Sequence, residues 1–150
     1  MLKSKSSASR PLGTSLTKKL VRSSRQAELN LQAPTFNRDC TSCKLHSMGC
    51  KTVCMDGFGP RRADVMIVGE APGATEDEAG VPFIGRSGKL VRDALLNAGI
   101  DPDKCYITNA VNCRPPDNKT PTSAQIRECR RWVQARIDQV KPKYVLLLGN

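Results

Sequence analysis

The chain has 150 residues, of which 39% are hydrophobic and 25% are charged. This length and composition fit one globular domain and exclude a wholly disordered protein. The net charge is +10, and no apolar run approaches the length of a membrane-spanning helix, so we expect no membrane partner.

The first 30 residues are basic and rich in Ser and Thr, and seven Lys and Arg residues precede the first acidic residue, Glu28. This composition predicts a disordered arm, with a short helix near residues 25–31. Such an arm would attract the phosphate backbone of DNA without reading its sequence; a solubilising tail and a transit peptide are the alternatives. The segment has no apolar core of a secretion signal, so we expect a cytoplasmic protein.

Residues 36–60 hold four of the seven cysteines, which predicts a loop-rich metal module within a domain that spans residues 31–150. An odd number of cysteines argues against a fully paired disulfide framework, and thiols clustered in a reducing compartment more often bind metal. Cys40 and Cys43 form a C-x2-C pair, a spacing that suits one metal centre held by a tight turn. Four cysteine ligands suit zinc as well as an iron–sulfur cluster.

Three short apolar runs, at residues 63–69, 106–108 and 144–148, predict buried strands. Helical patterns separate them, one over residues 87–97 and one that begins near Thr122. Alternation of strand and helix predicts an α/β protein with a parallel central sheet and right-handed crossovers, which is half of a doubly wound domain.

The helix boundaries and faces follow from local patterns. Thr122 and Gln125 have the spacing of a capping box, and Gly99 follows the last residue pair of the first helix as a stop signal. The residues we expect to face inward are Leu90, Val91, Ala94 and Leu95 in the first helix, and Ile126, Cys129, Val133, Ile137 and Val140 in the second.

Two polar loops follow the first two predicted strands. Gly69-Glu70-Ala71-Pro72-Gly73 leads to Glu76-Asp77 and then to Val81-Pro82-Phe83-Ile84-Gly85. Asn109-Ala110-Val111-Asn112-Cys113-Arg114-Pro115-Pro116 follows the second strand. In an open parallel sheet such loops lie together outside the carboxyl ends of the strands, where ligands bind.

These loops, in this order, resemble those of the family 4 (iron–sulfur) uracil-DNA glycosylases, and the resemblance runs from Cys40 to Gly149. It implies a three-layer α/β/α fold with an added Cys-rich metal module. It also implies a base-excision repair hydrolase that cleaves the bond between deoxyribose and uracil in DNA. Uracil-containing DNA would then be the partner.

The resemblance assigns roles to the loop residues. Phe83 would stack on uracil and Asn109 would hydrogen-bond its edge, with Gly69 in the same binding loop. Glu70 would position water or stabilise the positive charge that develops on the sugar, and Asp77 would be a supporting acid. Gly73 stands where better-known uracil glycosylases carry a Tyr that blocks the methyl group of thymine, so thymine exclusion would need another residue.

Further ligands follow from the same resemblance. It implies that Cys40, Cys43, Cys113 and Cys129 hold a [4Fe–4S] cluster, with zinc as the rival and Cys50 or Cys54 as substitute ligands. The position and charge of residues in or near these loops, and not the resemblance, make Arg86, Ser87, Lys89 and Arg114 candidate contacts to the DNA backbone; a solvated basic rim is the alternative. The free N–H groups at the start of the helix at Ser87 would also favour a phosphate.

The resemblance is incomplete at the carboxyl end. The family's His-Pro-Ser-like motif is absent, the only histidine is His46, and residues 144–148 would be an exposed apolar edge strand. We therefore expect a fragment with weak or no activity alone; a second polypeptide that completes the sheet and a degenerate homologue are the alternatives. The enzyme interpretation is favoured over a catalytically silent DNA-binding or replication-associated homologue, similar to phage proteins related to DNA polymerases.

Overall fold

The computed structural model describes residues 34–149. The predicted arm at residues 1–30 and the short helix near residues 25–31 lie outside this described part. Three parallel strands form one sheet: β1 (Val65–Gly69), β2 (Tyr106–Asn109) and β3 (Tyr144–Leu147), in the order β2-β1-β3. The register pairs Ile67 of β1 with Ile107 of β2 and with Leu146 of β3.

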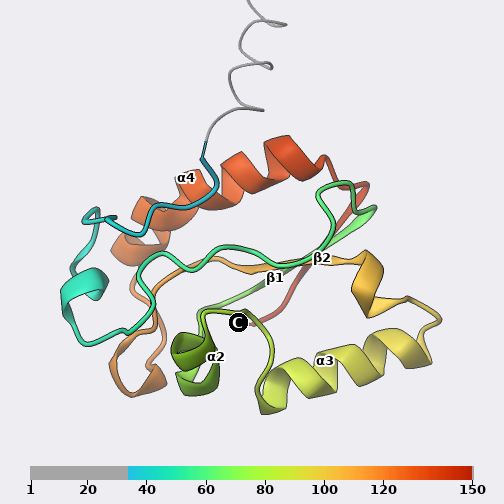
Figure 1. Cartoon of the computed structure of the whole chain (residues 1–150), viewed down its shortest axis with the longest axis horizontal. Coiled ribbons are helices and arrows are strands. Elements are labelled where there is room, and N and C mark those ends of the chain that lie inside the picture. The colour runs from blue at the N-terminus through green and yellow to red at the C-terminus, as the bar shows by residue number, and fades with distance from the viewer. Residues whose placement is uncertain (1–33, 150) are drawn as a thin grey trace, which may run out of the picture.

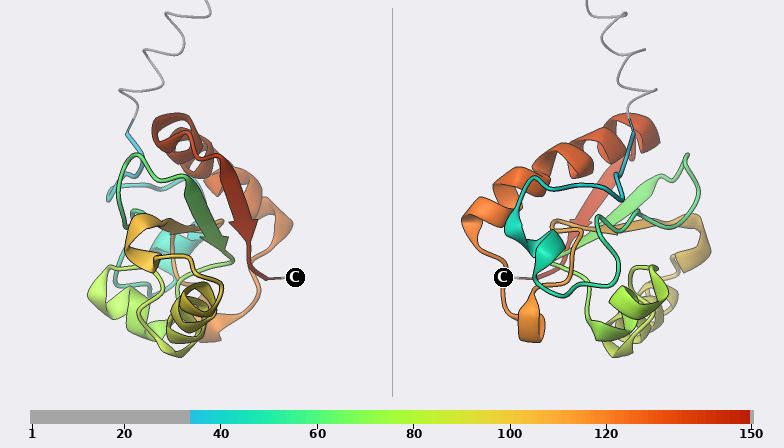
Figure 2. Two further views of the ribbon diagram at one scale, coloured as in Figure 1. Left: turned by 90° about the vertical axis from the view of Figure 1, so that its right-hand side faces the viewer. Right: turned by 60° about the vertical axis from the view of Figure 1, so that its left-hand side comes forward.

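Helices cover both faces of this sheet (Figures 1 and 2). The long helix α4 (Ser123–Val140) lies over one face, and α2 (Ala74–Ala79) and α3 (Arg86–Asn97) lie over the other. Short 3-10 turns occur at η1 (Lys44–Ser47), η2 (Pro102–Lys104) and η3 (Pro116–Asn118). The predicted three-layer α/β/α architecture with a parallel sheet is therefore confirmed.

The local start of α4 is the predicted capping box. Thr122 Oγ1 accepts a hydrogen bond from the Gln125 backbone N–H at 3.3 Å, and Gln125 Oε1 accepts one from the Thr122 N–H at 2.8 Å. Two otherwise unpaired N–H groups at the helix start are thereby satisfied. The helix ends at Val140, and the next residue, Lys141, adopts a left-handed backbone (φ 51°) ahead of Pro142.

The predicted inward faces of the helices are partly wrong. In α4 Ile126 is 41% exposed, whereas Trp132 and Arg136 are buried. In α3 Leu90 is 67% exposed, and only Leu95 among the four predicted residues is fully buried. The reason is that polar and aromatic side chains share the buried face of α4 with its apolar residues, so apolar spacing alone misplaces that face.

The core consists of three apolar clusters, which lie on different sides of the sheet. One, around Leu45 and Val111, joins the Cys-rich segment to α4 through Cys129 and Trp132. A second packs Met66 and Tyr106 with residues of α4, and a third packs Ile67 and Ile107 with Leu95 of α3. Alternate residues of β1 and β2 thus face opposite helical layers, as strand geometry requires.

Strand β3 forms one edge of the sheet within the described residues, beside β1 (Figure 2). Its apolar side chains are exposed, with Tyr144 at 70% and Leu147 at 73%. The expectation of an exposed apolar edge strand is confirmed.

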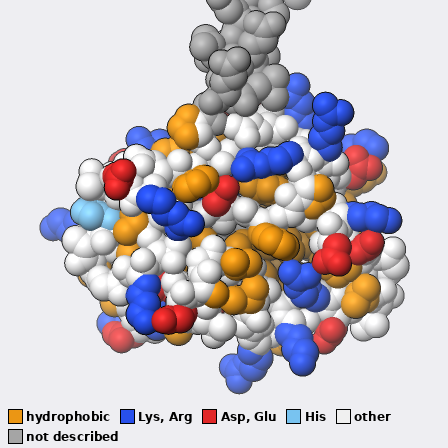
Figure 3. All heavy atoms as spheres, viewed as in Figure 1, with side chains coloured by type: hydrophobic (Ala, Val, Ile, Leu, Met, Phe, Trp, Pro, Cys, Tyr) orange, Lys and Arg blue, Asp and Glu red, His pale blue; other side chains and the backbone are white. Residues whose placement is uncertain are grey.

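The surface seen in Figure 3 carries Lys and Arg side chains that are spread among acidic and hydrophobic ones. Within residues 34–149 no helix combines the length and the apolar character needed to cross a membrane. The cytoplasmic location stays a prediction.

Candidate functional site

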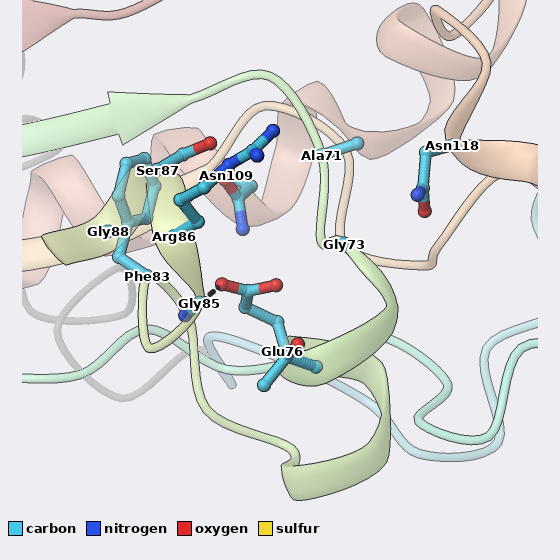
Figure 4. A pocket seen from close by; sticks show the side chains of 11 residues that line it. Ala71, Gly73, Glu76, Phe83, Gly85, Arg86, Ser87, Gly88, Asn109 and Asn118 are labelled. Atoms are coloured by element: carbon cyan, nitrogen blue, oxygen red, sulfur yellow. Dashed lines mark hydrogen bonds between the residues drawn. The ribbon is translucent and has the colours of Figure 1, made fainter. Parts of the chain in front are cut away.

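A cavity of about 300 Å³ opens where the loops after β1 and β2 meet the start of α3 (Figure 4). Its place, outside the carboxyl ends of parallel strands, is where open α/β sheets bind ligands. The residues that line it are Ala71, Gly73, Thr75, Glu76, Phe83, Gly85, Arg86, Ser87, Gly88, Asn109 and Asn118.

The three predicted base-binding residues come together: Phe83 and Asn109 line this cavity, and Gly69 lies against both of them. A Cβ atom on Gly69 would lie 2.6 Å from Phe83 Cε2 and 2.6 Å from Asn109 Oδ1. No side chain other than that of glycine fits between the ring and the amide at this distance. The end of β1 therefore lets the Phe83 ring and an amide from β2 approach one another closely.

The backbone of Phe83 is held in an unusual conformation by α3. Its φ is 58°, in the left-handed region that is rare for residues other than glycine. Gly88, in the first turn of α3, packs directly against it, because a Cβ on Gly88 would lie 2.7 Å from Phe83 Cα. Sequence analysis did not single out Gly88, although a glycine inside a helical pattern is the signal of such a close contact.

Glu76 is a site residue that sequence analysis missed as such. It lies in the first turn of α2, and its Oε1 accepts a hydrogen bond from the Gly85 backbone N–H at 2.7 Å. A Cβ on Gly73 would lie 2.8 Å from Glu76 Oε2. The carboxylate therefore occupies the space between two glycines on the cavity wall (Figure 4). The pattern that could have identified it is an acidic residue, Glu76, three positions after Gly73, the residue that precedes α2.

The two predicted catalytic acids lie in different surroundings. Glu70 follows β1 and lines a smaller hollow of about 140 Å³ beside the cavity, together with Pro115 and Lys119. Its Oε1 is buried and has no hydrogen-bond partner among the described residues. An unpaired buried carboxylate oxygen is costly, so it marks a place where a polar ligand or water would be stabilised.

Asp77 faces away from the cavity and toward the Cys-rich segment. Its carboxylate accepts hydrogen bonds from the backbone N–H groups of Lys51 (3.0 Å) and Thr52 (2.9 Å), and Thr52 Oγ1 donates to its carbonyl at 2.7 Å. Asp77 is 2% exposed and does not line the cavity. The contacts fit the predicted loop-ordering role, and a part in catalysis stays a prediction.

The four candidate DNA-backbone residues surround the cavity unevenly. Arg86 and Ser87 line it at the start of α3 (Figure 4), and Lys89 is exposed one residue after Gly88. Arg114 Nε donates to Asn118 Oδ1 at 2.8 Å, so Arg114 lies next to another residue of the cavity wall.

Six of the seven cysteines gather around one buried cluster between the Cys-rich segment, the loop after β2 and α4. Cys113 Sγ accepts a hydrogen bond from the Cys54 N–H at 3.2 Å, and Cys40 Sγ accepts one from Arg131 Nη2 at 3.7 Å. The members are Cys40, Cys43, Cys50, Cys54, Cys113 and Cys129, whereas Cys105 lies in the apolar cluster on the α3 side of the sheet.

The surroundings of the thiols shift their pKa values in different directions. Burial raises the pKa of Cys129 to about 11 and raises the pKa of Cys113 strongly. At Cys40 burial acts in the same direction, but hydrogen bonds from Ser42 and Arg131 outweigh it and lower the pKa below its ordinary value. Within residues 34–149, no three His, Cys, Asp or Glu side chains are arranged to hold a metal ion. The four predicted ligands thus share one cluster, and their metal stays a prediction.

The fold and the cavity define a class: a parallel α/β domain with an aromatic ring and an amide opposed at the carboxyl edge of its sheet. The chain belongs to the uracil-DNA glycosylase superfamily, because the family described as "Uracil DNA glycosylase superfamily" matches residues 57–150.

Similar proteins include type-4 uracil-DNA glycosylases. That of Pyrobaculum aerophilum is 42% identical over 112 residues, which cover 75% of this chain and 56% of the relative. That of Archaeoglobus fulgidus is 37% identical over 111 residues, covering 74% and 55%. A DNA polymerase of Bacillus phage SP01 is 34% identical over 97 residues, covering 64% and 10%. The chain spans about half the length of the type-4 glycosylases that it matches.

Proposed function

We propose that this chain acts in base-excision repair as a uracil-DNA glycosylase, which hydrolyses the N-glycosidic bond of uracil in DNA. The single observation that carries the proposal is the approach of Phe83 and Asn109 over Gly69 in the cavity. Enzymes of this kind must take the base out of the stack and hold it in a pocket that reads its edge and stacks on its face. The cavity offers one group for each task.

The base would lie on the Phe83 ring with its polar edge toward Asn109. A side-chain amide provides a donor and an acceptor, which match O4 and N3–H of uracil. Cytosine presents the opposite pattern at these positions, so an amide of fixed orientation discriminates between the two bases. Asn109 is 4% exposed, and this burial supports a fixed orientation.

Glu76 could exclude thymine from this site, where Gly73 replaces the Tyr that blocks the thymine methyl group in better-known uracil glycosylases. Its carboxylate fills the space beside Gly73 and is held there by the Gly85 N–H. A methyl group on the base that pointed toward this wall would have to displace the carboxylate from its hydrogen bond. The expected additional residue for thymine exclusion is, in this proposal, Glu76.

Glu70 would stabilise the charge that develops as the bond breaks. A positively charged sugar or a water molecule near its buried, unpaired Oε1 would gain an interaction that the protein otherwise lacks. Asp77 would support this site indirectly, because it holds α2, and with it Glu76, against residues 51 and 52.

The phosphates on either side of the base would meet the rim of the cavity. Arg86 and Ser87 stand at the N-terminus of α3, where helix N–H groups and the helix dipole favour an anion. Lys89 and Arg114 extend this rim. Such contacts would position the strand without reading its sequence.

We also propose that Cys40, Cys43, Cys113 and Cys129 bind a [4Fe–4S] cluster. The donor set fits, since four thiols from three separated segments share one buried cluster, and N–H groups of Cys54 and Arg131 already point at two of the sulfur atoms. When bound, the cluster would supply a cross-link between these segments and no chemistry at uracil. Zinc is the rival occupant.

The test is an anaerobic purification of the full chain with a visible absorption spectrum and iron, sulfide and zinc analysis. The same sample is then incubated with a uracil-containing oligonucleotide and assayed for abasic sites. Release of uracil that Glu70→Gln removes supports the proposed activity. A colourless protein loaded with zinc would refute the iron–sulfur assignment. It would not decide the proposed activity, which the uracil-release assay tests separately.

A catalytically silent DNA-binding homologue is the second candidate, and the similarity to a phage DNA polymerase over 97 residues favours it. It predicts binding of the oligonucleotide without release of uracil. If the bound oligonucleotide keeps its uracil, that result supports this second function and contradicts the first.

A further inference from the structure

Arg136 is a fully buried arginine that takes no part in the proposed chemistry. It lies on α4 and is 0% exposed. Nη1 donates to Thr108 Oγ1 at 2.7 Å and to Asn112 Oδ1 at 2.8 Å, and Nη2 donates to the Met55 carbonyl at 2.8 Å. One guanidinium therefore links α4 to two segments that are far apart in sequence, residues 108–112 and Met55.

The charge of this group is retained in the interior. Burial lowers the pKa of Arg136 from its ordinary value, and Asp56, whose Oδ1 lies 3.4 Å from Arg136 Nε, opposes that shift. An arginine stays protonated in proteins even when it is buried. A buried charge is tolerated only with partners of good geometry, so the interaction depends on all of them together.

The partners of Arg136 are the immediate neighbours of the functional residues. Thr108 precedes Asn109 in β2, and the two side chains point to opposite faces of the sheet, Thr108 toward α4 and Asn109 toward Phe83. Asn112 directly precedes Cys113. Met55 follows Cys54, whose N–H donates to Cys113 Sγ, and the Met55 N–H donates to the Asn112 carbonyl at 2.7 Å.

We propose that Arg136 is a positioning residue that fixes the end of β2, and with it the amide of Asn109, relative to the loop before Cys113 and the Cys-rich segment. The inference rests on the proposed function for the role of Asn109. In this proposal one hydrogen-bonded network on the α4 side of the sheet holds both the strand that carries Asn109 and the segments that carry the cysteine cluster. The network consists of Arg136 with Thr108, Asn112 and Met55, and we call it the bracket. Because the guanidinium is planar and presents several donors in a fixed fork, lysine cannot replace it.

The experiment compares Arg136→Lys with Arg127→Lys, which changes an exposed arginine of the same helix. Thr108→Val is a third variant, because it removes only the bond between the bracket and the strand that carries Asn109. We measure kcat and KM for uracil release separately, and amide hydrogen exchange over residues 108–113, with each protein well below its Tm.

For Arg136→Lys and Thr108→Val we expect kcat/KM to fall about 10-fold, which is the effect expected when one charge-assisted hydrogen bond is lost. We also expect faster amide exchange over residues 108–113 in both variants. Arg127→Lys should match the wild type in both. A purely structural Arg136 would lower Tm and leave kcat/KM of the folded variants unchanged, and that result would overturn the inference.

The two proposals fail in different ways. A wild-type chain that releases no uracil contradicts the proposed function, and hydrogen exchange then decides on Arg136 alone. Exchange over residues 108–113 that is the same in Arg136→Lys as in the wild type would show that Arg136 does not hold this segment, whatever the activity.

Discussion

At the scale of single residues, Asn109 is the group on which base recognition depends. Its Oδ1 lies against the space above Gly69, opposite the Phe83 ring. Asn109→Ala removes a donor and an acceptor without adding bulk, so we expect uracil release to fall by about 100-fold, the usual loss for one preorganised polar group. Single-turnover cleavage of a uracil-containing oligonucleotide measures this. Asn97→Ala, at the exposed end of α3, is the control, and an equal loss there would contradict the assignment.

Glu76 gives a second prediction at this scale, which concerns selectivity and not rate. Glu76→Ala empties the space beside Gly73, so we expect the ratio of thymine to uracil release to rise by about 10-fold or more, the effect of one methyl group in a pocket. Glu76→Gln keeps both the volume and an oxygen for the Gly85 N–H, and it should stay selective. Competition between thymine- and uracil-containing strands measures the ratio. An Ala variant that still rejects thymine would refute the role of Glu76.

At the scale of elements, the link between α2 and the Cys-rich segment depends on Asp77. Asp77→Ala leaves the partly buried N–H groups of Lys51 and Thr52 without their acceptor, which should lower the free energy of unfolding by about 1–3 kcal/mol. Asp77→Asn keeps one acceptor oxygen and should retain more of the stability. Denaturant unfolding measures both, together with uracil release by the folded protein. If Asn and Ala abolish release equally while Asn stays stable, Asp77 acts in catalysis and not only in loop ordering.

The elements themselves were largely predictable from sequence. The three strands, the start of α4 at Thr122 and the span of α3 follow from short-range signals, namely apolar runs and a capping box. The short helix α2 was missed, because its six residues hold two glutamates and an aspartate and show no apolar period. The buried face of α4 was predicted in part: Cys129 and Val140 are buried as expected, whereas Arg136 was missed because it is interior only through partners that come from distant parts of the chain.

The site was predictable to a different degree. Gly69, Phe83 and Asn109 were identified through a resemblance in motif order, and the fold brings them together as expected. Glu76 and Gly88 were not singled out as site residues, because their roles depend on contacts with Gly73, Gly85 and the Phe83 backbone that only tertiary structure creates. Local sequence shows that these residues are present but not which surfaces they approach.

At the scale of the whole molecule, two buried groups of side chains on the α4 side of the sheet join α4 to the loop after β2 and to the Cys-rich segment. One is the bracket around Arg136, and the other is the cluster of six cysteines that links the Cys-rich segment to Cys113 and to Cys129 of α4. Both connect the same three parts of the chain. Loss of either should therefore loosen the loop after β2 more than it loosens α3, which packs on the opposite face.

The cysteines allow this to be tested with a matched pair. Cys129 and Cys105 are both buried, at 5% and 2% exposure, but only Cys129 lies in the six-cysteine cluster. If Cys129 is a ligand, Cys129→Ser should lose most of the bound iron and lower Tm, because metal-ligand bonds contribute directly to folding. The Cys105→Ser variant should keep its full iron content, because Cys105 is as buried as Cys129 but lies in the apolar cluster on the α3 side of the sheet. Metal analysis and thermal unfolding of both variants measure this. Full iron content in Cys129→Ser, with loss of iron in Cys50→Ser or Cys54→Ser, would show that the fourth ligand is one of those two cysteines.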